Sequence, residues 1–138
     1  MRAVLDASTI ITLVKRHGDQ AVDALEGSTT LALTPYEIGN ALRTETQLTK
    51  TLTKKEADRL LYILYRLHAV LSIEAPATAE EAINILAVTR ETGTSFYDAS
   101  YLAEARKKRL PLATEDRRLA KTAIKNGIHT ITADDLSP

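Results

Sequence analysis

Apolar and polar positions follow two rhythms along the chain, and together they predict short strands between longer helices. Short apolar runs such as RAVLD (residues 2–6) and LPLAT (residues 110–114) are typical of buried strands, whereas the segments between such runs carry apolar residues every three or four positions, as amphipathic helices do. Pro35 opens one helix, and Thr53 with Glu56 forms a capping box at the start of another. The predicted strands are 2–6, 29–34, 71–74, 110–114 and 128–132, and the predicted helices are 8–16, 19–27, 35–48, 53–70, 78–93, 97–109 and 115–127.

Strands that alternate with helices predict an α/β fold, with helices packed around a central and mostly parallel sheet. The length of 138 residues fits a single domain over residues 1–138, and the chain contains no internal repeat, low-complexity segment or linker. Hydrophobic residues make up 44% of the chain, which is enough for a substantial core.

Composition excludes several classes of function. The 18 basic and 18 acidic residues balance, which argues against a surface built entirely for nucleic acid but leaves local basic patches open. The absence of cysteine excludes disulfides, zinc–thiolate sites and thiol catalysis. Asp6 interrupts any signal-peptide core, and the apolar stretch 60–71 is too short to span a bilayer and contains Arg66. We therefore expect a soluble cytoplasmic protein with no membrane partner.

Acidic residues stand where strands end. Asp6 is the one charge in AVLDASTIITLV (residues 3–14), and a buried carboxylate is costly unless it is paired, hydrogen-bonded or bound to a metal. Glu37 and Asp116 follow two other strands, and Asp98 opens a later helix. The carboxyl ends of parallel strands meet at one edge of a sheet, so we expect these acids to gather there. Each could be a helix cap, and together they could hold a divalent cation.

Divalent-metal hydrolysis is the chemistry that needs such a cluster. Mg²⁺ and Mn²⁺ prefer hard oxygen ligands, and two such ions can stabilise the attacking and leaving oxygens of a phosphodiester. This chemistry requires no catalytic cysteine, serine or histidine.

Four segments, in order, resemble the motifs of a PIN domain: VLDAS at the start, YEIGNAL at 36–42, FYDASYLAEA at 96–105 and LATEDRRL at 112–119. They resemble most closely the VapC-like toxin of VapBC toxin–antitoxin pairs, over residues 1 to about 132. The resemblance implies a compact Rossmann-like α/β/α sandwich and an endoribonuclease that depends on Mg²⁺ or Mn²⁺ and uses metal-activated water. It also implies a cognate antitoxin that supplies an arginine to the carboxylates.

The resemblance assigns site residues by position. The catalytic and metal-binding acids are Asp6, Glu37, Asp98 and Asp116, and the supporting residues are Ser8, Asn40 and Thr114.

Basic residues around the last acid are candidates for RNA binding. Arg117 and Arg118 flank Asp116 and could grip phosphates, whereas the run 106–109 fits a solvated helix face equally well. Glu115 is an additional acid without a metal role, and we expect it to face solvent or a basic side chain.

The predicted helix 53–70 has a broader apolar stripe than one core face needs. Tyr62 and Tyr65 widen it, which favours a homodimer or partner surface over core packing alone. The three histidines show no ligand spacing and are expected to be structural.

Other α/β functions fit less well. A phosphatase of the haloacid dehalogenase type needs a second aspartate where this chain has Ser8, and a dinucleotide-binding domain needs a glycine-rich first turn that DASTI lacks. A receiver domain needs paired acids near the first strand, which are not evident. The open alternative is a catalytically silent PIN-like binding module that acts through protein contacts.

Overall fold

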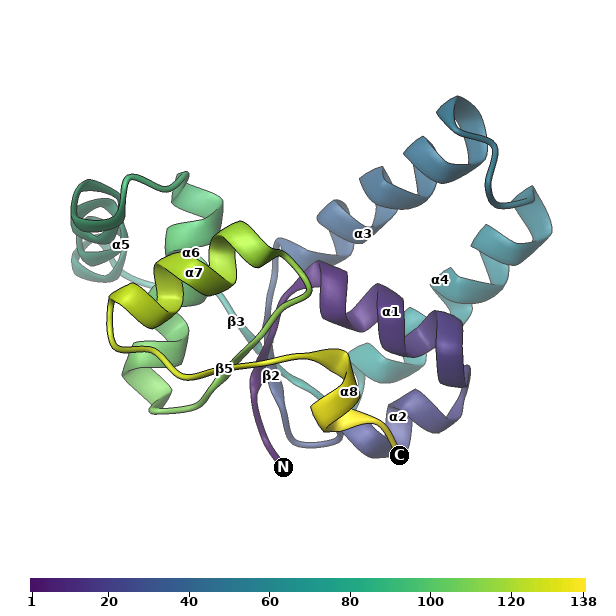
Figure 1. The fold of residues 1–138 in the computed structure, drawn as a ribbon, viewed down its shortest axis with the longest axis horizontal. Coiled ribbons are helices and arrows are strands. Elements are labelled where there is room, and N and C mark those ends of the chain that lie inside the picture. Colours follow the sequence, from purple (N-terminus) through teal and green to yellow (C-terminus); the bar gives the residue numbers. More distant parts are fainter.

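The computed structural model describes residues 1–138 and contains one five-stranded sheet in the order β3-β2-β1-β4-β5 (Figure 1). Every pair of neighbouring strands is parallel. The strands are β1 (Val4–Leu5), β2 (Thr29–Leu31), β3 (Ser72–Glu74), β4 (Leu112–Ala113) and β5 (Thr130–Ile131). The helices are α1 (Ala7–His17), α2 (Gln20–Leu25), α3 (Thr34–Arg43), the π-helix η1 (Thr44–Leu48), α4 (Lys54–His68), α5 (Ala79–Thr92), α6 (Phe96–Lys108), α7 (Arg117–Lys125) and α8 (Ala133–Leu136).

Helices cover both faces of the sheet, so the predicted α/β/α sandwich is confirmed. One hydrophobic cluster joins the sheet to α1, α2, α3, α4 and α8, and a second joins it to α5, α6 and α7. Figure 1 shows the two groups of helices on opposite sides of the strands. No helix combines the length and the apolar character that a membrane span requires.

The central strands feed both clusters because successive strand residues point to opposite faces. In β1, Val4 belongs to the second cluster and Leu5 to the first, and both are fully buried. Their partners in β4, Leu112 and Ala113, are divided between the clusters in the same way. A strand buried on both faces reads as a continuous apolar run, which explains why the sequence locates it.

The structure differs from the predicted elements at several places. The strands are two or three residues long, shorter than predicted. β1 ends where Asp6 caps α1, and β4 ends shortly before Asp116 caps α7. The predicted helix 35–48 is an α-helix that continues as η1, where the amide of Thr49 donates to the carbonyl of Thr44 at 2.9 Å. The four-residue α8 was not predicted, and Thr132 and Asp135 form its capping box.

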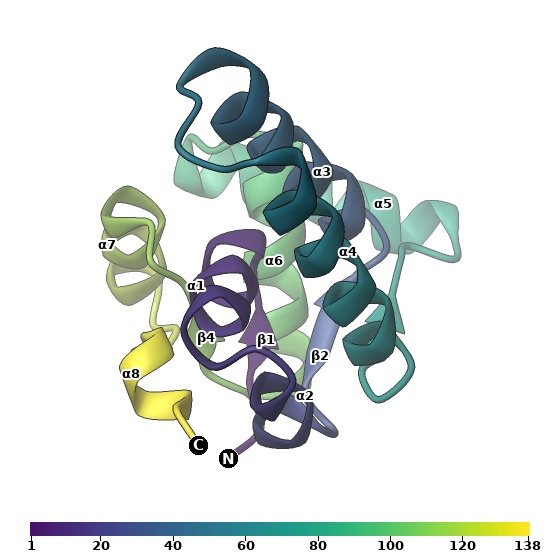
Figure 2. The same ribbon diagram turned by 90° about the vertical axis from the view of Figure 1, so that its right-hand side faces the viewer.

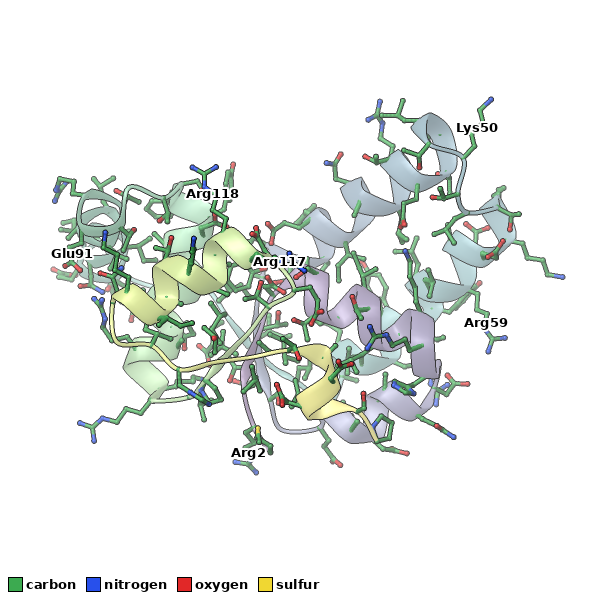
Figure 3. The ribbon with its side chains drawn as sticks, viewed as in Figure 1. Arg2, Lys50, Arg59, Glu91, Arg117 and Arg118 are labelled. Carbon is green, nitrogen blue, oxygen red and sulfur yellow. The ribbon has the colours of Figure 1, made fainter.

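α3, η1 and the start of α4 form an arm that extends away from the sheet (Figures 1 and 2). Lys50, labelled in Figure 3, marks its tip. The predicted capping box of Thr53 and Glu56 begins α4. Further along α4, Tyr62 and Tyr65 are exposed, whereas Ile63, Leu64 and Leu67 are buried in the first cluster.

Candidate active site

Asp6 ends β1 and caps α1, and both of its carboxylate oxygens accept hydrogen bonds. Oδ1 accepts the amide of Thr9 at 3.0 Å and the hydroxyl of Ser8 at 2.7 Å, and Oδ2 accepts the hydroxyl of Thr114. The residue is 6% exposed. Burial raises the pKa of the Asp6 carboxyl above its ordinary value, and these hydrogen bonds oppose the rise. The supporting roles expected for Ser8 and Thr114 therefore have a structural basis, because both hydroxyls orient Asp6.

The loop after β4 is held against the start of α1. The amide of Asp116 donates to the hydroxyl of Thr114 at 3.0 Å, and the amide of Glu115 donates to the hydroxyl of Ser8 at 3.0 Å. The sequence predicts that Glu115 faces solvent or a basic side chain. Its carboxylate instead accepts the amide of Ala133 at 2.6 Å and so helps to cap α8. Short helices need such acceptors because their first amides have no partner within the helix.

Glu37 lies in the first turn of α3 and is half-buried. Its Oε1 accepts the hydroxyl of Tyr101 at 2.5 Å. Burial raises the pKa of Glu37, the hydrogen bond from Tyr101 opposes this, and the nearby charges of Asp6 and Asp98 raise it further. Glu37, Asp6 and Asp98, which come from α3, the end of β1 and α6, are therefore close enough for their charges to act on one another.

Tyr101 is a site residue that the sequence reasoning missed. It is 1% exposed, and its hydroxyl lies 2.6 Å from that of Thr34 as well as bonding to Glu37. Thr34 in turn lies 2.9 Å from the hydroxyl of Thr30, which is 2.8 Å from the carbonyl oxygen of Leu5. Burial and the neighbouring Glu37 carboxylate raise the pKa of Tyr101, so the phenol stays protonated and donates. Tyr101 lies three residues after Asp98 on the same helix face, but nothing local in the sequence indicates its bond to Glu37.

Asp98 lies in the first turn of α6, which Ser95 caps. No hydrogen bond reaches its carboxylate. Burial raises the pKa of Asp98, the charges of Asp116 and Asp6 raise it further, and Arg118 lowers it. Of the four acids, Asp98 is the one whose carboxylate accepts no hydrogen bond from the protein.

Asp116 is exposed and caps α7, and its Oδ1 accepts the amides of Arg118 and Leu119 at 2.9 and 3.2 Å. Asp6 and Asp116 are therefore helix caps, as one of the two interpretations of the sequence predicted. A polar hollow of about 360 Å³ lies beside this residue, and Asp98, Asp116, Arg118 and Thr122 are among its lining residues.

Basic side chains near the acids carry no ion pairs. Arg117 and Arg118 are exposed and leave the first turn of α7 in different directions (Figure 3). In the run 106–109, by contrast, Arg106 pairs with Glu91 at 3.4 Å and Lys108 with Glu74 at 2.8 Å. Two of the four basic residues in that run are therefore paired with acids of this chain.

The charges of the acids act on one another, but the four carboxylates do not surround a single metal position. No group of three acidic or histidine side chains is arranged to hold a metal ion. Mg²⁺ is bound through one or two carboxylates and keeps several waters, so a pair of carboxylates beside a polar hollow fits its chemistry. Asp98 and Asp116, which line the same hollow, are such a pair. Asn40 is exposed, and no hydrogen bond joins its side chain to the acids.

Comparisons with known proteins agree with this arrangement. The sequence model of the family described as PIN domain matches residues 3–125. Two proteins of Pyrobaculum aerophilum are similar to this chain: Exonuclease VapC9 is 36% identical over 120 residues, which cover 86% of this chain and 84% of the relative, and Ribonuclease VapC3 is 31% identical over 126 residues, which cover 88% and 94%. The solved structure of PAE2754 from the same organism superposes with a TM-score of 0.73 at 27% identity, and covers 99% of this chain and 93% of that one.

The parallel sheet, the four motifs in order and these matches lead to one assignment: the chain belongs to the PIN domain family and is VapC-like.

Proposed function

We propose that this protein is an endoribonuclease that depends on Mg²⁺ or Mn²⁺ and acts as the toxin of a toxin–antitoxin pair. The observation that carries the proposal is the carboxylate of Asp98, which accepts no hydrogen bond and lines a polar hollow beside Asp116. A buried or half-buried carboxylate without a partner is costly, and such groups are typical of sites that bind a cation. The PIN family match and the names of the two relatives support nuclease chemistry.

Each site residue has a task that its environment supports. Asp98 and Asp116 would hold a divalent ion at the hollow, and Asp6 and Glu37 would complete that site or a second one. The bound ion would supply activation of water and charge stabilisation at the phosphate. Thr114 and Ser8 keep Asp6 oriented, and Tyr101 keeps Glu37 oriented.

Arg117 and Arg118 are proposed to bind RNA phosphates next to the hollow. Both are exposed and free of ion pairs, so their guanidinium groups are available to an anionic strand. These two positive charges next to the acids would offset the repulsion between the acids and the substrate.

Cleavage within the strand separates this proposal from the alternatives. One relative is named an exonuclease and the other a ribonuclease. Incubation with a circular single-stranded RNA and Mn²⁺ tests the mode of cutting, because a circle offers no end to an exonuclease. Linear product supports the endonuclease. Degradation of linear RNA alone would assign an exonuclease, and no degradation of either would favour the silent binding module.

The first prediction concerns Asp98→Asn. This change removes the uncompensated carboxylate and keeps its size, so we expect cleavage to fall at least 100-fold while the circular dichroism spectrum is unchanged. Asp23→Asn is a matched control, because Asp23 is an exposed first-turn acid on α2, away from the site. Cleavage by Asp98→Asn at the wild-type rate in Mg²⁺ would contradict the assignment.

The second prediction concerns stability, metal and pH. Mn²⁺ binds the folded site and should raise the melting temperature at pH 7; an ion at 100 times its Kd adds about 2.7 kcal/mol to the free energy of unfolding. Without metal, Asp98→Asn should melt at or above wild type, because the Asp98 carboxylate caps no amide. Metal should stabilise this variant less.

The sign of the pH dependence follows from the raised pKa. A carboxyl whose pKa is higher in the folded state destabilises the fold at neutral pH, and this penalty is lost as pH falls through the raised value. The difference between Asp98→Asn and wild type should therefore be largest at pH 7 and close in acid. Thermal melts in EDTA and in Mn²⁺ across pH 4–8 measure it, and an unchanged wild-type melt in millimolar Mn²⁺ would count against a metal site.

The third prediction concerns Tyr101→Phe, which removes the only hydrogen bond to the Glu37 carboxylate and leaves the ring in place. Loss of an outer partner of a metal ligand costs about 10- to 100-fold in metal affinity or activity. We expect a decrease of that size in Mn²⁺ affinity by calorimetry and in the cleavage rate. Tyr62→Phe on the exposed face of α4 is the control. Unchanged Mn²⁺ affinity in Tyr101→Phe would remove Glu37 from the metal site.

The fourth prediction concerns protein partners. We propose a homodimer through α4, because Tyr62 and Tyr65 are 79% and 67% exposed, and a cognate antitoxin whose arginine pairs with the site acids. Light scattering of the purified chain should give about twice 15.1 kDa, and Tyr62→Ser with Tyr65→Ser should give the monomer.

The antitoxin should co-purify with wild type and less with Asp98→Asn. A wild-type monomer rejects the dimer, and equal co-purification rejects arginine blockade.

A further inference from the structure

Aromatic side chains are few in this protein, and four of the six lie beside the acids. The chain has five tyrosines and one phenylalanine. Tyr101 is buried, and two tyrosines lie on α4. The other three, Tyr36, Phe96 and Tyr97, lie in the first turns of α3 and α6 and are 81%, 40% and 62% exposed. Tyr36 directly precedes Glu37 and Tyr97 directly precedes Asp98, so each of these two exposed rings shares the first helical turn with a site acid.

The outer face of α3 continues this pattern away from the acids. Tyr36, Asn40 and Arg43 are exposed and lie at positions i, i+4 and i+7, which share one helix face, whereas Thr34, Ile38 and Leu42 face the core. The side chains of Asn40 and Arg43 make no hydrogen bond or ion pair within the chain. A ring, an amide and a cation therefore follow one another along α3, the helix that leads into the arm (Figures 1 and 2).

On the other side of the acids, Phe96 and Tyr97 open α6 next to the polar hollow that Asp98 and Arg118 line. Scattered exposed rings need no explanation, but exposed rings near a free amide and a free cation match the requirements of a single nucleic acid strand. An unpaired base offers a flat face to a ring and a polar edge to an amide, and each phosphate offers a charge to an arginine. A folded protein partner would need a continuous apolar patch instead, and here polar residues separate the rings.

We propose that Tyr36 and Tyr97 stack on unpaired bases on the two sides of the phosphate at the acids, and that Asn40 and Arg43 follow the strand along α3. Both stacking contacts require bases that are not stacked on one another, as in a single strand or in a loop whose bases are splayed out. Paired RNA is disfavoured because its bases stack on one another and their faces are covered. This inference rests on the proposed nuclease function, and it adds the residues that select the strand.

Binding can be measured apart from cleavage. In an Asp98→Asn background, which keeps the RNA intact, fluorescence anisotropy gives the Kd of a labelled unpaired oligonucleotide and of the duplex of the same sequence. Tyr36→Ala and Tyr97→Ala should each weaken binding of the unpaired strand about tenfold, within the range for loss of one base–ring stack. Tyr36→Phe and Tyr97→Phe should bind as the tyrosines do, because they keep the ring. Ile83→Ala is the control, because Ile83 is an exposed apolar residue of α5 away from both proposed surfaces, and it should leave the Kd unchanged.

The outcomes separate this inference from the proposed function. Alanine variants that bind and cleave unpaired RNA as the parent does would overturn the stacking surface and leave the nuclease intact. Phenylalanine variants as weak as the alanine variants would also overturn it, since the hydroxyls and not the rings would then be responsible. A protein with no ribonuclease activity whose alanine variants still lose strand binding would refute the nuclease and keep the surface. Loss of antitoxin binding alone, with RNA binding unchanged, would reassign the rings to a protein partner.

Discussion

The carboxylate of Asp6 holds together two parts of the chain that lie more than 100 residues apart. One oxygen caps α1 directly after β1, and the other accepts the hydroxyl of Thr114 directly after β4. β1 and β4 are adjacent parallel strands, so these bonds fix where the chain leaves the sheet after each of them. The loop with Thr114, Glu115 and Asp116 is in turn bonded to Ser8 and to the start of α8. The positions of Asp116 and of the start of α8 depend on this junction.

Stability and the proposed chemistry share the same residues here. Asp6 and Asp116 are helix caps whose oxygens accept protein donors, whereas Asp98 has none. A capping carboxylate is held in one position by the backbone, and a fixed position is what a ligand or catalytic group also needs. The two interpretations of an acid at a strand end are therefore compatible, and a cap need not be only a cap.

The sequence was sufficient for the fold and for the placement of the acids at one edge, because both depend on local signals. Buried strands such as β1 read as apolar runs, and parallel strands bring their carboxyl ends to one edge. Tyr101 could not be assigned, because its bond to Glu37 joins positions 64 residues apart that only packing brings together. The same holds for Glu115, whose partner amide belongs to α8. η1 was also missed, since an amphipathic pattern does not distinguish a π-helical turn from an α-helical one at a helix end.

The hydroxyl chain that runs from Leu5 through Thr30, Thr34 and Tyr101 orients Glu37 without a basic side chain. Ionic strength weakens exposed charge–charge contacts, but it scarcely affects buried hydrogen bonds among hydroxyls. Added salt should therefore leave the position of Glu37 unchanged while it screens Arg117 and Arg118 at the surface. Within one site, the geometry of the acids and the attraction of an anion thus respond to different properties of the solvent.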